Sequence, residues 1–74
     1  MARSARADIK RSLGQRVRDR RLSLNMSQED LASLAEIRRA LISEIERGEA
    51  NPTLESVIRL AAALRINLSE LFNQ

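Results

Sequence analysis

Hydrophobic positions recur along this 74-residue chain at helical spacing, and no segment alternates with the period of two that marks a strand. The pattern predicts an all-α fold, a compact five-helix bundle with short connections. The expected helices span 8–24, 28–34, 38–47 and 54–64, followed by a short fifth helix that opens near residue 67.

Each predicted helix has one hydrophobic side, which should face a common core. The remaining side of the first helix carries most of the basic residues. The positions expected to face the core are Ile9, Leu13, Val17 and Leu24 in the first helix, Leu31, Leu34 and Ala35 in the second, Ile42 and Ile45 in the third, and Val57, Ile58, Ala61 and Leu64 in the fourth.

Capping residues support these boundaries. Ser27, followed three residues later by Asp30, predicts an N-cap, because a serine hydroxyl can accept a hydrogen bond from a free backbone N–H. Thr53 is expected to cap the fourth helix, and Asn67 with Glu70 repeats the capping pattern before the fifth. Gly48 fits the C-terminal end of the third helix.

The most informative segment is 28–47, where two short helices are joined by a turn of about three residues near Glu36 and Ile37. Helices joined so tightly must cross steeply, which requires a small residue at the crossing. Ala32 occupies that position. The surrounding hydrophobic positions are Leu31, Ala35, Ile37, Ile42 and Ile45.

Charge is distributed unevenly along the chain. The net charge is +3, but residues 1–21 hold eight basic against two acidic residues, and residues 22–74 hold five basic against eight acidic ones. Twelve of the thirteen bases are arginine, whose guanidinium suits bidentate contacts to phosphate and guanine. The alternative is an ordinary solvated basic helix face.

Composition excludes several classes of protein. The chain has no Cys, His, Trp or Tyr, which removes disulfides, zinc fingers and Cys or His nucleophiles. No carboxylate clusters with a nucleophile, so we expect no enzyme, cofactor or metal site. No apolar stretch reaches the roughly 18 residues that span a bilayer, and the start lacks a secretory signal, so we expect a cytoplasmic bacterial or phage protein.

The segments QEDLA (28–32) and ISEIERG (42–48) resemble the Cro/C1-type (XRE-like) helix-turn-helix family of phage repressors and bacterial regulators. NPTL (51–54) and LSELF (68–72) extend the resemblance over about residues 9–73. It implies a lambda-repressor-like fold and a transcriptional regulator that binds double-stranded DNA. Within the family, a stand-alone domain this small most resembles the controller proteins of restriction–modification systems.

The resemblance identifies the third helix as the recognition helix, which enters the major groove. The positions implied in base readout are Arg38, Arg39, Ala40, Ser43 and Glu44. Arg39 could bind guanine O6 and N7 together, Ala40 could touch a thymine methyl group, and Glu44 could accept from a cytosine amino group. For Arg38 and Arg39, the alternative is a solvated entrance to the turn.

Phosphate contacts form a second predicted set. Gln28 matches the family residue that opens the second helix at the DNA backbone, where free N–H groups favour an anion. Weaker candidates are Arg16, Arg20, Arg47 and Asn51. Residues 1–7 form a predicted basic arm ahead of the 8–74 domain, and its Arg3 and Arg6 either reach the DNA or are solvated.

The family resemblance also implies a partly buried ion pair between Arg21 and Glu46. Three positions depart from the family pattern. Glu36 stands where glycine usually supplies a positive φ, which implies strain or a different turn. Leu41 replaces a tyrosine frequent in controller proteins, and Glu49 replaces a residue that is often basic, which should reduce phosphate attraction there.

The last 18 residues carry more hydrophobic side chains than a small bundle needs, so some should form a homodimer interface that places two recognition helices about 34 Å apart. The predicted interface residues are Val57, Ile58, Leu68, Leu71 and Phe72. The alternative is that all belong to the core.

Two alternatives to a controller protein are a phage-type repressor and an antitoxin-like module that grips a protein partner. RNA polymerase is a further candidate partner, through an acidic edge at Glu49 or Glu55. No membrane partner or small-molecule effector is expected.

Overall fold

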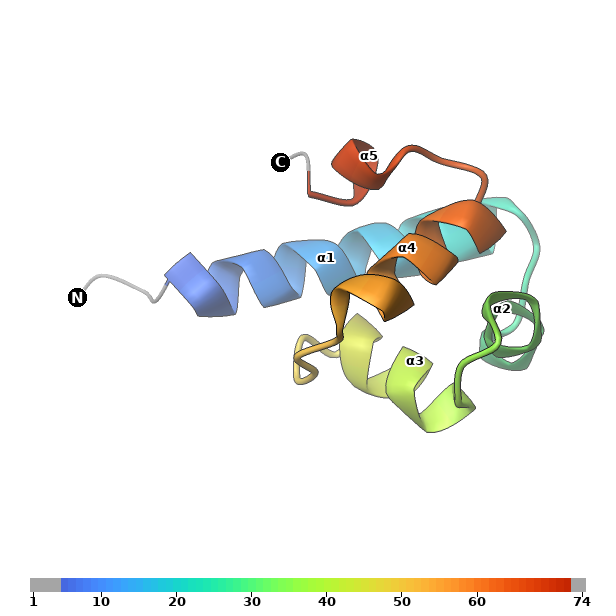
Figure 1. The fold of residues 1–74 in the computed structure, drawn as a ribbon, viewed down its shortest axis with the longest axis horizontal. Coiled ribbons are helices and arrows are strands. Elements are labelled where there is room, and N and C mark those ends of the chain that lie inside the picture. Colours follow the sequence, from blue (N-terminus) through green and yellow to red (C-terminus); the bar gives the residue numbers. More distant parts are fainter. Residues whose placement is uncertain (1–4, 73–74) are drawn as a thin grey trace.

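The computed structural model describes residues 5–72, and within that range it contains helices and no strands. The five helices are α1 (Ala5–Ser23), α2 (Gln28–Ala35), α3 (Arg39–Glu46), α4 (Leu54–Ala63) and α5 (Leu68–Phe72). Figure 1 shows α1 along the length of the molecule, with α5 on one side, α3 on the opposite side, and α4 crossing α1. The predicted all-α five-helix fold is confirmed.

The helix boundaries differ from the prediction mainly at the N-terminus. Helix α1 begins at Ala5, so residues 5–7 of the predicted basic arm are helical and Arg6 belongs to α1. The rest of that arm, with Arg3, lies outside the described residues. Arg38 is the extended N-cap of α3 and not its first helical residue.

The predicted caps are present. The Ser27 hydroxyl accepts from the Asp30 backbone N–H at 2.9 Å, and the Asp30 carboxylate accepts from the Ser27 backbone N–H at 2.9 Å. The hydrogen bond from the Ser27 backbone N–H to the carboxylate is the main cause that lowers the pKa of Asp30 below its ordinary value, because it favours the ionised form. The Thr53 hydroxyl accepts from the Ser56 N–H, and the Glu70 carboxylate accepts from the Asn67 N–H.

All five helices contribute to one hydrophobic core. Its fully buried side chains are Val17, Leu31, Ile42, Ile45, Leu60, Leu64 and Leu71. Burying each such side chain stabilises the fold by about 1.5–3 kcal/mol.

Three residues expected in the core are exposed. Ile9 lies near the N-terminal end of α1, which projects beyond the other helices (Figure 1). Leu34 is 62% exposed because Leu31 and Ala35, one turn apart, form the buried side of α2. Ile58 is 47% exposed, one position past the buried Val57.

Gly14 allows α1 to approach α3 closely. A Cβ atom at this position would lie 2.2 Å from the carbonyl oxygen of Ile45, which no real contact permits. A glycine inside a helix costs about 0.5–1 kcal/mol relative to alanine, and the close packing against α3 explains why it is tolerated here. The hydrophobic pattern had given Gly14 no role.

The turn between α2 and α3 has the left-handed residue that the family pattern requires, without the glycine. Glu36 has φ 58° and ψ 45°. The next residue, Ile37, donates its backbone N–H to the Ala32 carbonyl oxygen at 3.0 Å, which closes the turn. Glu36 therefore carries the strain of a side chain in left-handed backbone.

Replacing this residue should stabilise the protein. Glu36→Gly removes a steric penalty of roughly 1–2 kcal/mol, and the greater freedom of glycine in the unfolded chain offsets about half of it. We expect a net gain of about 0.5–1 kcal/mol and a rise in melting temperature of a few degrees, measured by circular dichroism. Ser33→Gly, inside α2, should instead lower the melting temperature; a variant at position 36 that melts no higher would show that the turn is unstrained.

Candidate nucleic-acid interface

Helices α2 and α3 form a helix-turn-helix unit. Ala32 and Leu31 on α2 are buried with Ile42 and Ile45 of α3, so the small side chain lies among the packed residues as predicted. Packing on this side leaves the other side of α3 open to solvent. The five predicted base-readout residues are all accessible there: Arg38, Arg39, Ala40 and Glu44 are exposed and Ser43 is partly exposed. A short helix with such a side can enter a DNA major groove.

The predicted ion pair between Arg21 and Glu46 is present. Arg21 Nε donates to Glu46 Oε2 at 2.7 Å and Nη2 donates to Oε1 at 3.0 Å, a bidentate arrangement. The side chains are only 9% and 3% exposed. A third donor, Nη1, reaches the Met26 carbonyl oxygen at 2.8 Å. The pair therefore joins α1 and the α1–α2 turn to α3.

Burial opposes the charge on Arg21, but the hydrogen bonds to Glu46 have the larger effect and raise the pKa of Arg21 above its ordinary value. The guanidinium is therefore charged at neutral pH.

Gln28 lies beside this pair. It is the first residue of α2, and its Nε2 donates to Glu46 Oε1 at 3.1 Å. The start of α2 is therefore adjacent to the end of α3, and the Gln28 amide lies beside the buried carboxylate of Glu46.

Arg47, the C-cap of α3, continues this surface. Its Nε lies 3.0 Å from Glu49 Oε1, and its Nη1 donates to the Ser43 hydroxyl. Asn51 is exposed in the loop that follows. The structure therefore brings three predicted phosphate contacts, Gln28, Arg47 and Asn51, to the α2 start and the segment at the end of α3.

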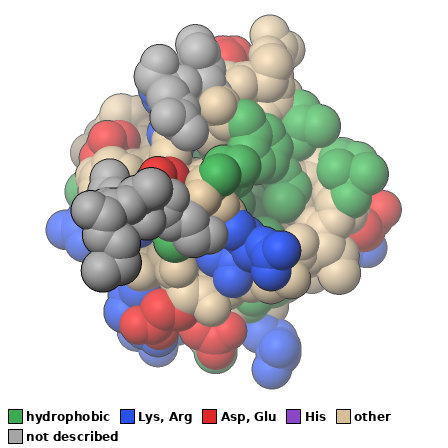
Figure 2. Space-filling model, turned by 90° about the vertical axis from the view of Figure 1, so that its left-hand side faces the viewer, with side chains coloured by type: hydrophobic (Ala, Val, Ile, Leu, Met, Phe, Trp, Pro, Cys, Tyr) green, Lys and Arg blue, Asp and Glu red, His purple; other side chains and the backbone are tan. Residues whose placement is uncertain are grey.

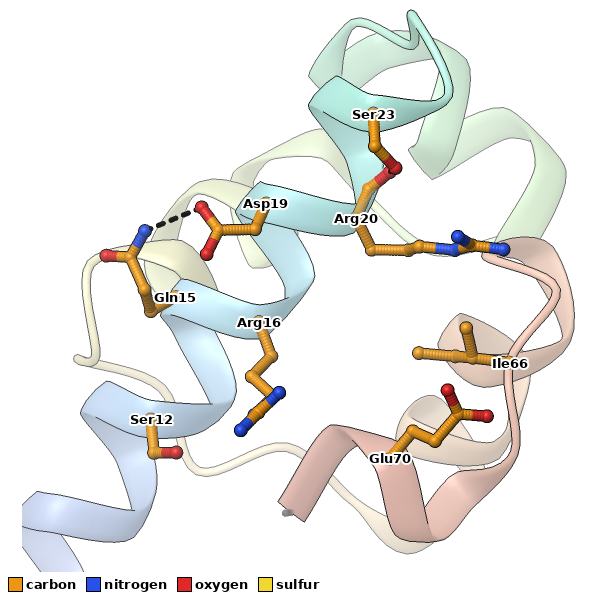
Figure 3. A pocket seen from close by; sticks show the side chains of 8 residues that line it. All are labelled: Ser12, Gln15, Arg16, Asp19, Arg20, Ser23, Ile66 and Glu70. Atoms are coloured by element: carbon orange, nitrogen blue, oxygen red, sulfur yellow. Dashed lines mark hydrogen bonds between the residues drawn. The ribbon is translucent and has the colours of Figure 1, made fainter. Parts of the chain in front are cut away.

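Arg16 and Arg20 lie elsewhere. They line an open groove between α1 and the α4–α5 region, together with Ile66 and Glu70 (Figure 3). Arg20 Nε donates to the Leu64 carbonyl oxygen at 2.8 Å, which ties α1 to the end of α4. Arg16 follows Gly14 by two residues, about 200° around the helix, so it points away from α3. The structure does not bring these two arginines to the α3 surface.

Arg18 is a basic residue of α1 to which the sequence analysis gave no role. It comes four residues after Gly14 and three before Arg21, and both of those residues contact the end of α3. Residues so spaced share one side of a helix, and Arg18 is exposed there. The signal was available in the sequence, but only once Gly14 is known to mark the side of α1 that faces α3.

The predicted dimer residues divide into two groups. Val57 and Leu71 are buried in the core of a single copy, which corrects their assignment to an interface. They lie on the inner sides of α4 and α5. Ile58, Leu68 and Phe72 are exposed, with Phe72 at 44%, and Leu54 of α4 is exposed with them. Figure 2 shows hydrophobic side chains gathered into one patch on the face it presents.

Other kinds of site find no support in the part of the chain that the structure describes. Residues 5–72 contain no group of three or more acidic, Cys or His side chains placed to hold a metal ion. No helix among them is long and apolar enough to cross a membrane.

Comparison with known proteins gives one consistent family. The helix-turn-helix family model matches residues 17–71. Control protein C.SmaI of Serratia marcescens is 40% identical over 67 residues, covering 90% of this chain and 80% of that protein. Control protein C.BamHI of Bacillus amyloliquefaciens is also 40% identical over 67 residues, covering 89% and 83%.

A solved structure gives the same result. The restriction–modification controller protein C.AhdI from Aeromonas hydrophila superimposes with a TM-score of 0.82 at 40% identity, covering 85% of this chain and 96% of that one.

The buried ion pair should be essential for stability. Glu46→Ala leaves the Arg21 charge without its partner in a buried position, and we expect a loss of about 3–5 kcal/mol in unfolding free energy, measured by urea denaturation. Glu44→Ala, an exposed neighbour on the same helix, serves as the control and should change stability little. Equal unfolding curves for the two variants would show that the pair contributes nothing.

Proposed function

Because the chain belongs to the helix-turn-helix family, we propose that it is a sequence-specific DNA-binding regulator of transcription that controls a restriction–modification operon. The observation that carries the proposal is the exposed side of α3, held in place by the buried Arg21–Glu46 pair. The similarity to relatives named as control proteins supports the proposal that the regulated genes are those of a restriction–modification operon. A regulator of this kind acts where the bacterial chromosome lies, in the cytoplasm, by binding and not by catalysis.

Base readout would come from α3. Arg39 is the first helical residue and is exposed, so its guanidinium can reach guanine O6 and N7 in the major groove. Ala40 offers a methyl group, and Glu44 offers an acceptor to a cytosine amino group. Arg38 and Ser43 lie at the edges of this set.

Phosphate binding would flank the helix. Gln28 lies at the positive end of α2, where backbone N–H groups favour an anion. Arg47 and Asn51 follow α3, and Arg18 lies on the adjacent side of α1. We leave Arg16 and Arg20 out of this interface because they line the groove on the side of α5.

A homodimer would place two copies of α3 in successive major grooves, about 34 Å apart. The exposed hydrophobic residues of α4 and α5 support such an interface, because a helix pair with this much exposed hydrophobic surface gains by covering it. The residues proposed to meet their symmetry mates are Leu54, Ile58, Leu68 and Phe72. Glu49 and Glu55 each pair with an arginine of this chain, so we propose no contact with RNA polymerase through them.

Selection of binding sites from random duplex DNA at about 0.15 M salt tests the proposed function. We expect enrichment of an inverted repeat with half-site centres about 10 base pairs apart. If a folded protein enriches no sequence, the helix-turn-helix serves another partner, as in an antitoxin-like module.

Two variants separate base readout from phosphate binding. Arg39→Ala should weaken operator binding by about 1–3 kcal/mol and relax the preference at one base pair per half-site. Arg18→Ala should weaken binding to every sequence alike and reduce the salt dependence by about one phosphate contact. If Arg39→Ala weakened binding to every sequence alike and Arg18→Ala relaxed a base preference, the roles assigned to the two residues would be reversed.

Dimerisation should depend on the exposed side of α4. Ile58→Glu places a charge in the proposed interface, and we expect a monomer by analytical ultracentrifugation at concentrations where the unchanged protein is a dimer. Leu34→Glu, at a hydrophobic position on α2 that is 62% exposed against 47% for Ile58, is the control and should leave the dimer intact. A dimer that survives the change at position 58 would place the interface elsewhere.

A further inference from the structure

Three side chains form a hydrogen-bonded chain at the end of α3. The Arg47 guanidinium donates to the Ser43 hydroxyl through Nη1 and pairs with Glu49 Oε1 through Nε, at 3.0 Å. Arg47 and Glu49 are exposed, so this arrangement lies on the surface that would meet DNA. An acidic residue is thus bound to an arginine that phosphate would also attract.

The backbone fixes the position of Glu49. Gly48 has φ 74°, and its N–H donates to the Ile45 carbonyl oxygen at 3.0 Å. The next N–H, of Glu49, donates to the Glu44 carbonyl oxygen at 2.9 Å. These two bonds close the end of α3 and turn the chain so that Glu49 returns beside Arg47. The pairing therefore follows from the helix end and does not depend on a loosely placed loop.

This ion pair is poorly placed to stabilise the fold. The Arg47 and Glu49 side chains are 55% and 60% exposed, and pairs so open to water contribute little to stability. The carboxylate, however, occupies one of the guanidinium N–H donors from which an anionic phosphate oxygen could accept, and it neutralises the charge that attracts phosphate. Its main effect should therefore appear when DNA competes for Arg47.

We propose that Glu49 is an intramolecular competitor of DNA phosphate for Arg47, and that it lowers the sequence-independent part of the affinity for DNA. This inference rests on the proposed function and concerns the same surface. Among the proposed base-reading residues, only Ser43 belongs to the chain of three. Arg39, Ala40 and Glu44 lie outside it, so Glu49 should weaken binding to operator and random DNA by about the same factor. It sets how tightly the protein holds DNA, and leaves the choice of bases to the rest of α3.

The test compares two variants with the same change in net charge. Glu49→Gln frees Arg47, whereas Glu55→Gln breaks another solvent-exposed pair, with Arg59 on α4, whose side chains are 45% (Arg59) and 69% (Glu55) exposed. Affinity for a random duplex is measured across a range of salt concentrations. We expect Glu49→Gln to bind roughly two- to fivefold more tightly, with a log–log salt slope steeper by about 0.9. Glu55→Gln should bind like the unchanged protein, and both variants should melt like it.

A double-mutant cycle with Arg47→Ala distinguishes competition from a general loss of negative charge. If Glu49 acts through Arg47, then Glu49→Gln gains nothing when Arg47→Ala is already present. An equal gain in both backgrounds, or equal effects of Glu49→Gln and Glu55→Gln, overturns the inference.

The random duplex keeps this test separate from that of the proposed function. A protein that binds duplex DNA but shows no effect of Glu49→Gln contradicts the competition alone. A protein that binds no duplex DNA contradicts the proposed function and the inference with it.

Discussion

The bidentate pair between Arg21 and Glu46 is the interaction on which the proposed DNA-binding surface depends. Arg21 comes from α1 and Glu46 from the last turn of α3, and the third donor of Arg21 holds the Met26 carbonyl oxygen just before α2. Gln28 adds a hydrogen bond from the start of α2 to the same carboxylate. Three helices therefore meet at two charged side chains, and the exposed residues of α3 are positioned by contacts that no DNA would touch.

The local parts of the fold were predictable from the sequence. Capping at Ser27 and Thr53 needs only neighbouring residues, so their patterns gave the starts of α2 and α4 correctly. At position 36 the family resemblance left two possibilities, a strained left-handed residue or a different turn, and the structure has the left-handed residue. Its side chain departs from the family pattern, yet the backbone keeps the geometry.

Features that depend on how the helices pack against one another were less predictable from the sequence. A hydrophobic residue such as Leu34 or Ile58 fits a helical stripe that is one residue wider than the side the neighbours cover, so spacing alone assigns it to the core. Leu71 shows the opposite error, since it was assigned to an interface and is buried in the core. Val57 was expected both in the core and at the interface, and the packed bundle places it in the core. For the same reason the sequence could not show which basic residues of α1 face α3. Arg16 was predicted to contact phosphate, but it lines the groove on the side of α5, whereas Arg18 lies on the side of α1 that packs against α3.

Gly14 bears on how specificity could be transplanted between regulators of this kind. The backbone of Ile45 and Glu46 lies directly against Gly14. The distance between α3 and α1 is therefore set by the C-terminal half of α3 and not by the side chains that would read bases. The exposed positions of residues 38–44 can therefore be exchanged for those of another regulator, while the buried Ile42 is kept. The position of α3 against α1 is held by four residues, Gly14, Arg21, Ile45 and Glu46. They have to be kept or transferred together if a grafted helix is to meet DNA at the same angle.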